Sequence, residues 1–516
     1  MGRSVTQGSS FWTTTDKFTR DTGLFCTNAF NVESDALILS KWHGDGDNIN
    51  GLYKSLLWNQ ERYVNWEKYL QWRGDGHLIS VAPTRSGKGV GCVVPNLLNY
   101  SGSVVVIDPK GENYEKTWLY RKRVLKQQIV CLDPFSIVTD KGDSDVFNPL
   151  DSIIERRYFY SDADIYELNP VFDADVSRLA ETLVVRQPDE KDPHWNDKAV
   201  TVLRALITLT IFRTGLGFVE HWDLAALREY MCMPAKEFRN QLETISLMDE
   251  LPSMVRRAAN EILAMGENEL MSVLSTVNRH IEFLDTPCVA SVLGRDTENT
   301  FSFETLNDPE KRISIYIVIP PHYFTRYSRL VRLWISMAID VVTHRTPSFG
   351  AAYESSYPPV LFLLDEMAQL GRMEPIKQAV SLMAGYGMTL WMIIQDLAQM
   401  QGLYKEDWQT FLANARIQQF FGINDTTTAK MISEMLGSAT YSNVIETEST
   451  QGSHFFQTQT TDGLNRNDAG RNLFTPDEIR RLRPEIMLMF VQGMNPILAQ
   501  KIRYYDDTLF KPRASK

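Results

Sequence analysis

A glycine-containing turn early in the chain has the residue types of a phosphate-binding loop. It follows an apolar run that predicts a strand and precedes a stretch that predicts a helix. Its residues are Ala82, Pro83, Thr84, Arg85, Ser86, Gly87, Lys88, Gly89 and Val90. The backbone N–H groups of such a turn and of the next helix bind phosphate. We therefore expect residues 84–90 to bind a nucleotide, with Lys88 on its β and γ phosphates.

The turn departs from the general pattern G-x-x-x-x-G-K-[ST] at two positions. Ala82 stands where the first glycine is usual, and Gly89 stands where a hydroxyl side chain usually binds Mg²⁺. Thr84, Ser86 or water would then have to complete the metal shell. The alternative interpretation is an ordinary glycine-containing turn between a strand and a helix.

Two adjacent carboxylates follow a second apolar run, which extends from Pro359 to Leu364. Ligands of α/β sheets bind beyond the carboxyl ends of the strands. We expect Asp365 to hold Mg²⁺, directly or through water, and Glu366 to orient and polarise an attacking water. A strand that ends in solvated acidic residues is the alternative.

A third polar group ends the apolar run from Thr389 to Ile394. This group is Gln395, a neutral amide that would lie beside the γ phosphate if its strand neighbours the strand before Asp365. In that position it could respond to hydrolysis. The alternative is a polar residue at a strand end that bonds only to backbone.

The elements that must position these groups appear as short apolar runs. They span residues 77–83, 103–108, 129–133, 313–320, 360–366, 389–394, 417–423 and 486–493. Continuous apolar strands of this kind are typical of a mostly parallel sheet that is buried on both faces. Helical spacing replaces the strand signal between residues 170 and 300. The fold class that we expect is α/β, with a P-loop NTPase core and an inserted all-α domain.

The expected organisation has three parts. Residues 1–73 form an aromatic-rich lead-in segment, residues 74–169 and 301–516 form the nucleotide-binding domain, and residues 170–300 form the all-α insert. The tract from 446 to 463 is rich in Thr, Ser and Gln with few aliphatic residues, and it predicts a mobile loop.

Composition excludes several classes of protein. A net charge of -11 argues against nucleic-acid binding over the whole surface, so any contact with DNA must be local. The five cysteines form no Cys-x-x-Cys pair, which argues against a zinc site or a disulfide framework and favours a reducing cytoplasm. No apolar run approaches the roughly 20 residues that span a bilayer. The amino terminus lacks the apolar core of a secretory signal.

Eight motifs in order resemble the TraG-like coupling proteins of type IV secretion and conjugation. They are APTRSGKGVG at 82–91, VVVIDPKGEN at 104–113, LDPF at 132–135, FNPL at 147–150, LLDEMAQLG at 363–371, IIQDLAQM at 393–400, FFGINDTTTAKMIS at 420–433 and LFTPDEIRRL at 473–482. The resemblance implies a RecA-like motor that uses ATP and Mg²⁺ and assembles as a homo-hexamer. It also implies partners: DNA, expected to be single-stranded, a relaxase complex, and the channel ATPases and inner-membrane components of a type IV secretion system.

The resemblance carries over residue by residue. Lys88 matches the P-loop lysine, Asp365 and Glu366 match the acidic pair, and Gln395 matches the glutamine after the next strand. The Lys-Gly ending of the loop resembles the family's own form. Asp108, Lys110 and Glu112 match the motif after the second strand.

The family commonly carries two amino-terminal membrane helices, and this sequence shows none. We therefore expect a chain without a transmembrane segment at the cytoplasmic face of the bacterial inner membrane. Either an anchor has been removed or a separate protein recruits the motor.

Ring motors of this kind use an arginine from a neighbouring subunit to stabilise charge on the transferring phosphoryl group. Arg372, seven residues beyond Asp365, and Arg416, before the run at 417, are candidates for this role by position. Basic clusters at 121–123 and 480–481 could touch DNA, although solvated helix faces are favoured. The aromatic stretch 323–327 could stack on bases, with core packing as the favoured alternative.

Two other functions are compatible with the same motifs. The chain could be a docking receptor or scaffold in which ATP only stabilises a ring, although the Asp365–Glu366 pair favours hydrolysis. It could also be a cytosolic DNA helicase or translocase, a class that shares the motor core but not the IDPKGEN and LFTPDEI motifs.

Overall fold

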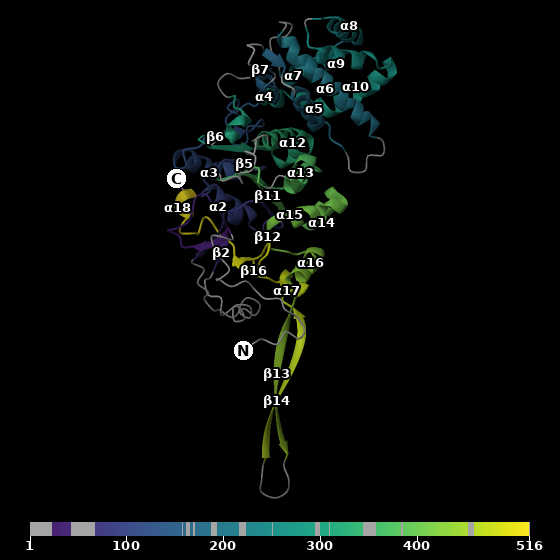
Figure 1. Ribbon diagram of the computed structural model, residues 1–516. Helices are drawn as coiled ribbons and strands as arrows, with labels where there is room; N and C mark the ends of the chain where they lie inside the picture. The colour runs from purple at the N-terminus through teal and green to yellow at the C-terminus, as the bar shows by residue number, and fades with distance from the viewer. Residues whose placement is uncertain are drawn as a thin grey trace.

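The computed structural model of the chain combines an α/β body with a helical lobe and a long two-stranded hairpin (Figure 1). The lobe and the hairpin lie at opposite ends of the body (Figure 1). The residues that the structure describes are 23–42, 68–156, 158–160, 166–168, 171–186, 193–215, 223–249, 251–294, 300–308, 310–343, 358–382, 385–451 and 459–514.

The body is built on a 12-stranded sheet in the order β1-β3-β2-β16-β15-β12-β4-β11-β10-β5-β9-β6. Every neighbouring pair from β12 to β6 is parallel. These strands are β12 (Ala415–Phe420), β4 (His77–Val81), β11 (Met388–Ile394), β10 (Val360–Leu364), β5 (Val104–Ile107), β9 (Ile313–Ile317) and β6 (Gln128–Leu132). The residues of β4, β9, β10 and β11 are all buried, as expected for a parallel sheet covered on both faces.

Five antiparallel strands extend this sheet on the β12 side. They are β15 (Ile486–Val491), β16 (Ile497–Gln500), β2 (Leu37–Trp42), β3 (Lys68–Trp72) and β1 (Leu24–Thr27). The expected lead-in segment 1–73 therefore supplies three strands to the main sheet, and the predicted boundary at 73 falls inside one sheet. Short strands within an irregular aromatic-rich sequence show no clear period, because their place is set by pairing with distant partners. Residues 1–22 and 43–67 lie outside the described part.

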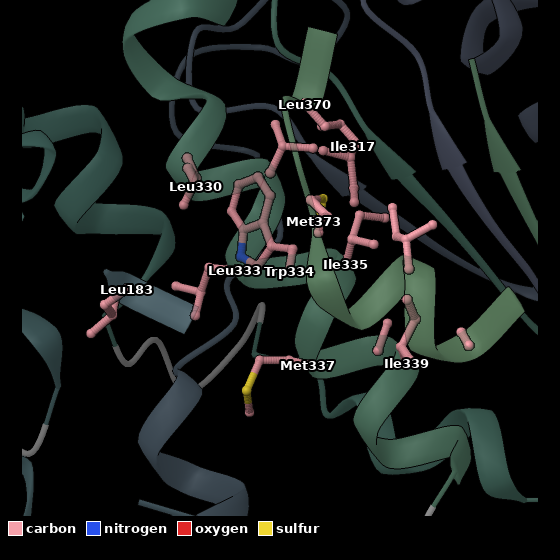
Figure 2. Packing of buried hydrophobic residues seen from close by; sticks show 14 of the residues in the cluster. Leu183, Ile317, Leu330, Leu333, Trp334, Ile335, Met337, Ile339, Leu370 and Met373 are labelled. Atoms are coloured by element: carbon pink, nitrogen blue, oxygen red, sulfur yellow. The ribbon is translucent and has the colours of Figure 1, made fainter. Parts of the chain in front are cut away.

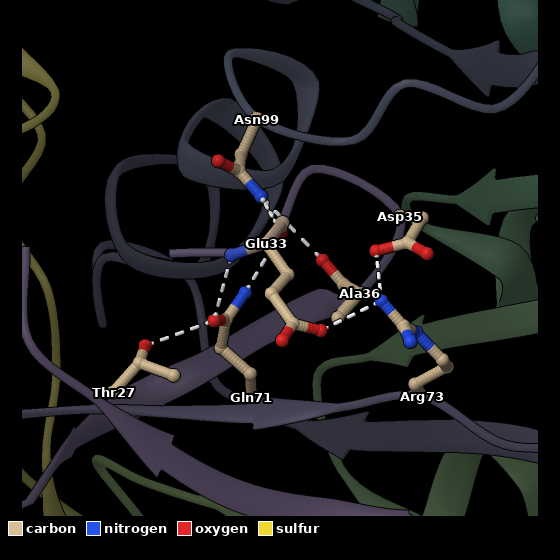
Figure 3. Close-up of polar contacts among 7 residues, drawn as sticks. All are labelled: Thr27, Glu33, Asp35, Ala36, Gln71, Arg73 and Asn99. Atoms are coloured by element: carbon tan, nitrogen blue, oxygen red, sulfur yellow. Dashed lines mark hydrogen bonds and ion pairs between the residues drawn. The ribbon is translucent and has the colours of Figure 1, made fainter. Parts of the chain in front are cut away.

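Partly buried and exposed polar contacts join the amino-terminal strands to the body (Figure 3). The side chain of Gln71 accepts from Thr27 Oγ1 at 2.9 Å and donates to the Glu33 carbonyl at 2.9 Å. Asn99 also donates to the Glu33 carbonyl, at 2.8 Å. Arg73 pairs with Glu33 at 2.6 Å. The segment before residue 73 is thus attached directly to the chain that follows the phosphate-binding turn.

Helices cover both faces of the parallel strands. One face packs on α12 (Pro321–Thr343), α13 (Glu374–Leu382), α14 (Leu397–Tyr404), α15 (Trp408–Asn414) and α16 (Thr426–Leu436). The other face packs on the helix after the turn and on α3 (Glu112–Arg123). Trp334 of α12 is fully buried in the core that α12 shares with the helical lobe, as Figure 2 shows.

The helical lobe begins after β6. It contains α4 (Pro149–Arg156), α5 (Phe172–Leu183), α6 (His194–Gly215), α7 (Leu224–Cys232), α8 (Ala235–Ser246), α9 (Ser253–Leu263), α10 (Glu267–Ile281) and α11 (Pro287–Val292), with 3-10 turns η5 (Glu282–Asp285) and η6 (Phe303–Asn307) after α10 and α11. A short hairpin of β7 (Tyr158–Tyr160) and β8 (Tyr166–Leu168) precedes α5. Helices α5 to α11 lie within the range expected for the all-α insert. No helix of the described residues is both long and apolar enough to cross a bilayer.

The prediction of a mobile loop at 446–463 is wrong for the residues that the structure describes. Strands β13 (Ser438–Gln451) and β14 (Gln459–Asn472) form an antiparallel ladder, and residues 452–458 lie outside the described part. Low hydrophobicity led to the prediction, but a two-stranded ladder satisfies its backbone groups by pairing and needs no buried face for that purpose. Beyond the hairpin the chain forms α17 (Pro476–Arg480), returns to the sheet, and ends in α18 (Lys511–Ala514).

Candidate nucleotide site

The sheet order places the predicted groups at one edge. Strands β4, β11 and β10 are consecutive and parallel, so their carboxyl ends meet. The phosphate-binding turn follows β4, Gln395 follows β11, and Asp365 with Glu366 follows β10. The sequence expectation that the Gln395 strand neighbours the Asp365 strand is therefore met.

Four predicted side chains form one contact cluster at this edge. Lys88 Nζ lies 3.1 Å from Asp365 Oδ1 and contacts Glu366 Oε1. Gln395 Nε2 donates to the other carboxylate oxygen of Glu366 at 2.8 Å. Gln395 therefore bonds to an acidic side chain, as a residue that orients Glu366 would. Lys88 is neutralised by the acidic pair, so an incoming phosphate has to compete with two carboxylates for it.

Burial shapes the charge of this cluster. Desolvation raises the pKa of Asp365, and the nearby Lys88 ammonium opposes that rise. The side chains of Lys88, Asp365 and Glu366 keep 13%, 14% and 16% exposure, so the cluster is open to a ligand from one side. A cation that bound here would replace part of the Lys88 charge beside Asp365.

Glu366 has an uncommon backbone conformation. Its φ of 57° and ψ of 37° lie in the left-handed region, just before the 3-10 turn η7 (Met367–Leu370). For a residue other than glycine this costs about 1 to 2 kcal/mol. The conformation turns the Glu366 side chain back toward Lys88 and Gln395, and Asp365 Oδ1 supports it by accepting the Glu366 N–H at 3.0 Å.

The helix expected after the turn starts as a π-helix. The π segment η4 (Gly89–Val93) continues into α2 (Val94–Leu97), and the Val94 N–H bonds to the Gly89 carbonyl. Pro95 lacks an N–H and cannot make an α-helical bond to Gly91. The first turns widen where that bond is missing, a feature often found near functional sites.

The residues present fit a Mg²⁺ ion held with a phosphate ligand. Mg²⁺ in proteins usually takes one or two carboxylates, phosphate oxygens and several waters, and Asp365 supplies the carboxylate. Ser86 Oγ is buried without a hydrogen-bond partner, whereas Thr84 is exposed. A Cβ added at Gly89 would meet nothing within 4 Å, so the missing hydroxyl leaves open space there. Of the two hydroxyls considered from the sequence, Ser86 is the better enclosed.

Asp108 lies behind this cluster and caps a helix. Its Oδ2 accepts the Tyr114 N–H at 2.8 Å at the start of α3, and its side chain is buried. Burial raises its pKa to about 7, and the charge of Asp365 adds to that rise. Lys110 is exposed, and Glu112 is exposed and pairs with Lys116 at 3.2 Å. The structure gives Asp108 a positioning contact and leaves Lys110 and Glu112 at the surface.

Comparison with known proteins identifies the family. Residues 43–516 match the family described as type IV secretory system conjugative DNA transfer, which is most of the chain. The chain belongs to that family. The resemblance to TraG-like coupling proteins is therefore confirmed.

Individual members of the conjugative DNA transfer family are distant in sequence. The conjugal transfer protein TraG of Escherichia coli is 29% identical over 87% of this chain and 70% of its own length. Protein VirD4 of Rhizobium rhizogenes is 26% identical over 84% of this chain and 59% of its own length. The plasmid coupling protein TrwB, solved with ADP and Mg²⁺, superposes with a TM-score of 0.57 at 14% identity, over 83% of this chain and 85% of its own. The fold is thus the RecA-like α/β fold of that structure, as the sequence predicted.

Neither of the two candidate arginines contacts the predicted phosphate-binding turn of the same chain. Arg416 is exposed at the amino end of β12, where its Cβ would lie 3.1 Å from a Cβ added at Gly76 before β4. That is the edge of the sheet opposite to the turn. Arg372 is directed toward Asp407 at 3.5 Å and Glu374 at 3.6 Å. Neither arginine contacts the Lys88 cluster within this chain.

The basic residues proposed as candidates for DNA contact lie in different environments. Arg121 is fully buried and donates to the carbonyls of Leu97 at 2.7 Å and Tyr100 at 3.0 Å, so both surface interpretations of this residue are wrong. Its guanidinium caps the carboxyl end of α2, where backbone carbonyls lack helical partners. Arg481 pairs with Asp477 one turn away at 3.0 Å on an exposed helix face.

Two rings of the aromatic stretch belong to the core. Phe324 and Tyr327 are buried, whereas Tyr323 is 41% exposed and stacks on Phe135 with ring centroids 4.5 Å apart. Core packing, the alternative that the sequence favoured, therefore accounts for Phe324 and Tyr327.

One residue that contacts the turn could not be predicted from any motif. Lys501 follows β16, more than four hundred positions from the turn, and its ammonium donates to the Ser86 carbonyl at 2.5 Å. A single lysine after a strand carries no motif, so only the folded chain shows this contact.

Proposed function

We propose that the chain is a coupling ATPase, which uses ATP hydrolysis to pass DNA, alone or with a bound relaxase, into a type IV secretion channel. The observation that carries the proposal is the cluster of Lys88, Asp365, Glu366 and Gln395 at the carboxyl edge of adjacent parallel strands. Membership of the conjugative DNA transfer family supports the substrate class. The ADP and Mg²⁺ bound to TrwB support the cofactors.

Each side chain has a role that its present contacts make possible. Lys88 would leave the two carboxylates and contact the β and γ phosphates. Asp365 would hold Mg²⁺, which neutralises phosphate charge when bound. Glu366, oriented by the Gln395 amide, would polarise a water for attack. The strained backbone of Glu366 keeps its carboxylate directed at this point.

The assembly and partners belong to the same proposal. We propose a homo-hexamer at the cytoplasmic face of the inner membrane, in which Arg372 or Arg416 of one subunit completes the site of the next. Both arginines are at least partly exposed and have no contact with their own cluster among the described residues, as a contribution in trans requires. The substrate would be single-stranded DNA presented with a relaxase complex, and the helical lobe would contact it. Channel ATPases and inner-membrane components would receive it.

The chemistry is tested by separating nucleotide binding from turnover. Lys88→Ala should weaken nucleotide binding severely, because the phosphates lose their main cation. Glu366→Gln should keep nucleotide binding but lower turnover by at least about a hundredfold, the usual size of a general-base contribution. Equilibrium binding of a fluorescent ADP analogue and steady-state phosphate release, with and without single-stranded DNA, measure the two quantities.

The outcomes also separate the alternatives. Wild-type protein that binds nucleotide but shows no DNA-stimulated hydrolysis would favour a docking scaffold. Near-normal ATPase rates in both variants would refute the assignment of these residues. Strand separation in the absence of secretion partners would favour a helicase.

A further inference from the structure

Lys501 enters the nucleotide site from the carboxyl-terminal part of the chain. Its Nζ crosses the ring of Phe421, 4.9 Å from the centroid, and donates to the Ser86 carbonyl at 2.5 Å. The backbone N–H of Lys501 donates to the Glu485 carbonyl at 2.8 Å. This bond holds the chain at Lys501 against the start of β15. Lys501 forms no ion pair with any described carboxylate, and burial lowers the pKa of its ammonium.

The residues after Lys501 run along the helix that follows the turn. A Cβ added at Gly91 would lie 2.9 Å from the Ile502 carbonyl, so the segment touches the π-helix directly. Arg513 donates to the Leu98 carbonyl and to Asn99 Oδ1, both at 2.9 Å, at the far end of α2. We call residues 501–514 the carboxyl-terminal strap. It is bonded to the turn at one end and to the end of α2 at the other.

The strap is itself anchored to the amino-terminal strands. Asp507 is buried and pairs with Lys41 of β2 at 2.6 Å. It also accepts from the hydroxyl of Tyr69 of β3 at 2.7 Å. The position of Lys501 is therefore fixed from both sides, by β16 before it and by these anchors after it.

The contact with Ser86 determines which way one peptide group of the turn faces. The Ser86 carbonyl and the Gly87 N–H belong to the same planar trans peptide, so they point in opposite directions. Lys501 holds the carbonyl, and the Gly87 N–H then points away from Lys501. Gly87 has a φ of 89°, which lets the chain turn back toward Lys88 after this peptide.

A lysine in this place differs in function from Lys88. Its ammonium bonds to the carbonyl side of the loop, whereas phosphate is bound by the N–H side of such loops. We propose that Lys501 is a positioning residue for nucleotide binding, which holds the Ser86–Gly87 peptide with its N–H directed to the phosphate and couples the loop to the carboxyl-terminal strap. This inference rests on the proposed nucleotide site and adds a residue that the motifs do not contain.

The test compares Lys501→Met, which keeps the aliphatic stem, with Lys501→Arg, which keeps a cationic donor. Loss of a charge-assisted hydrogen bond that orients the loop should raise the Kd for a fluorescent ADP analogue about tenfold in Lys501→Met. Lys501→Arg should stay within about threefold of wild type, because the donor and charge remain. Turnover at saturating ATP should change by less than about twofold, because an effect on binding alone leaves kcat unchanged.

Arg503→Met is the matched control. Arg503 is an exposed cation of the same strap, two residues away, and the variant should leave the Kd unchanged. Phe421→Leu offers a second route to the same contact, since it removes the ring beneath the ammonium but keeps an apolar side chain. It should raise the Kd in the same direction as Lys501→Met by a smaller factor.

The outcomes distinguish this inference from the proposed function. A Kd for Lys501→Met equal to that of wild type, in protein shown to be folded by circular dichroism, would overturn the role of Lys501 alone. Equal increases for Lys501→Met and Arg503→Met would also overturn it, because general loss of charge would then explain both. Wild-type protein that binds no nucleotide would overturn the proposed site as well.

Discussion

Lys88 contacts two carboxylates, and this pairing has a consequence for binding. The ammonium is neutralised by Asp365 and Glu366, so a phosphate gains only the difference between two sets of charge contacts. Gln395 adds a hydrogen bond to Glu366 and does not depend on the ligand. Nucleotide binding would therefore exchange the Lys88 contacts for phosphate contacts while the Gln395–Glu366 hydrogen bond is kept.

His77 provides a residue-scale prediction about pH. It is fully buried at the start of β4, where Nδ1 accepts the Leu390 N–H at 3.2 Å and Nε2 donates to the Ala379 carbonyl at 3.1 Å. Burial lowers its pKa to about 4, from about 6.5 in the unfolded chain. Between these values the unfolded chain binds a proton that the folded chain does not. Stability should therefore fall by up to about 3 kcal/mol as the pH drops from about 6.5 to about 4.

Urea unfolding across this pH range measures the loss. His280 contributes with the same sign, because burial lowers its pKa to about 4 as well. His77→Phe should be less stable than wild type at neutral pH but should lose less stability on acidification. His322 is exposed, so His322→Asn is the control. Its unfolding free energy should change with pH as steeply as that of wild type. If the unfolding free energy of His77→Phe falls with pH as steeply as that of wild type, the prediction is contradicted.

At the scale of elements, the site depends on where strands and helices end. Strand β4 ends at Val81 and β11 at Ile394, and the Ala82 N–H bonds to the Ile394 carbonyl at 2.9 Å. This bond extends the ladder one residue past the end of β4, so the turn begins from a fixed point. Gly422, after β12, lets the backbone approach the turn closely from the β12 side. A Cβ at Gly422 would lie 2.9 Å from Ser86 Cβ.

The β13–β14 hairpin provides an element-scale prediction. It extends away from the body and lies at the opposite end from the helical lobe (Figure 1). Ser438 and Asn472 pair at its base, and the next pair is Ala439 with Arg471. Residues 440–470 can therefore be replaced by an Asn-Gly turn that suits a tight hairpin. Because no contact of the described residues joins the hairpin to the Lys88 cluster, the Kd for a fluorescent ADP analogue should stay within about twofold of wild type.

Isothermal titration and thermal unfolding of this variant provide the measurement. The pair of Arg471 with Glu478 of α17 is kept, so the base of the hairpin should remain ordered. A folded variant that has lost nucleotide binding would show that the hairpin acts on the site from a distance.

At the scale of the whole molecule, strands from the amino-terminal and carboxyl-terminal parts of the chain form one side of the sheet. Strands β1 to β3 lie on one side of β16, and the carboxyl-terminal strap crosses from β16 to the turn. The helical lobe packs through α12 on the other part of the sheet. Lys501 and Asp507 therefore join the turn to the amino-terminal strands.

The whole-molecule prediction concerns a neighbouring subunit. If Arg372 or Arg416 acts in trans, ATPase activity per subunit should rise with protein concentration as rings assemble. Alanine at the active arginine should lower the rate by a factor on the order of 10³ to 10⁵. Mixing that variant with Lys88→Ala should restore part of the activity, because some interfaces regain an intact turn and an intact arginine.

The measurement is phosphate release from the two variants alone and from their mixture. Alanine variants of Arg372 and Arg416 are each mixed with Lys88→Ala. The one whose activity is not restored by mixing is the internal control for the other. Activity that is independent of concentration in a demonstrated monomer would contradict the prediction.

The polar groups of the candidate site could be predicted from the sequence alone. The turn at 84–90, the pair Asp365–Glu366 and Gln395 are each local groups placed directly after apolar runs. Parallel strands bring their carboxyl ends to one edge, so strand-end residues of this kind can be predicted to meet. The long apolar runs and the helical range 170–300 likewise predicted the fold class, because both signals are periodic within a short window.

The contacts that join distant segments could be identified only from the tertiary structure. Lys501 and Ser86 are separated by 415 positions, and neither lies in a pattern that names the other. Arg121 stands in a basic run typical of a surface, yet its guanidinium is buried and bonded to the carbonyls of Leu97, the last residue of α2, and Tyr100, three residues beyond it. The strands of the amino-terminal segment were missed for the same reason. Pairing energy between remote backbone groups belongs to the folded chain and leaves no period in the sequence.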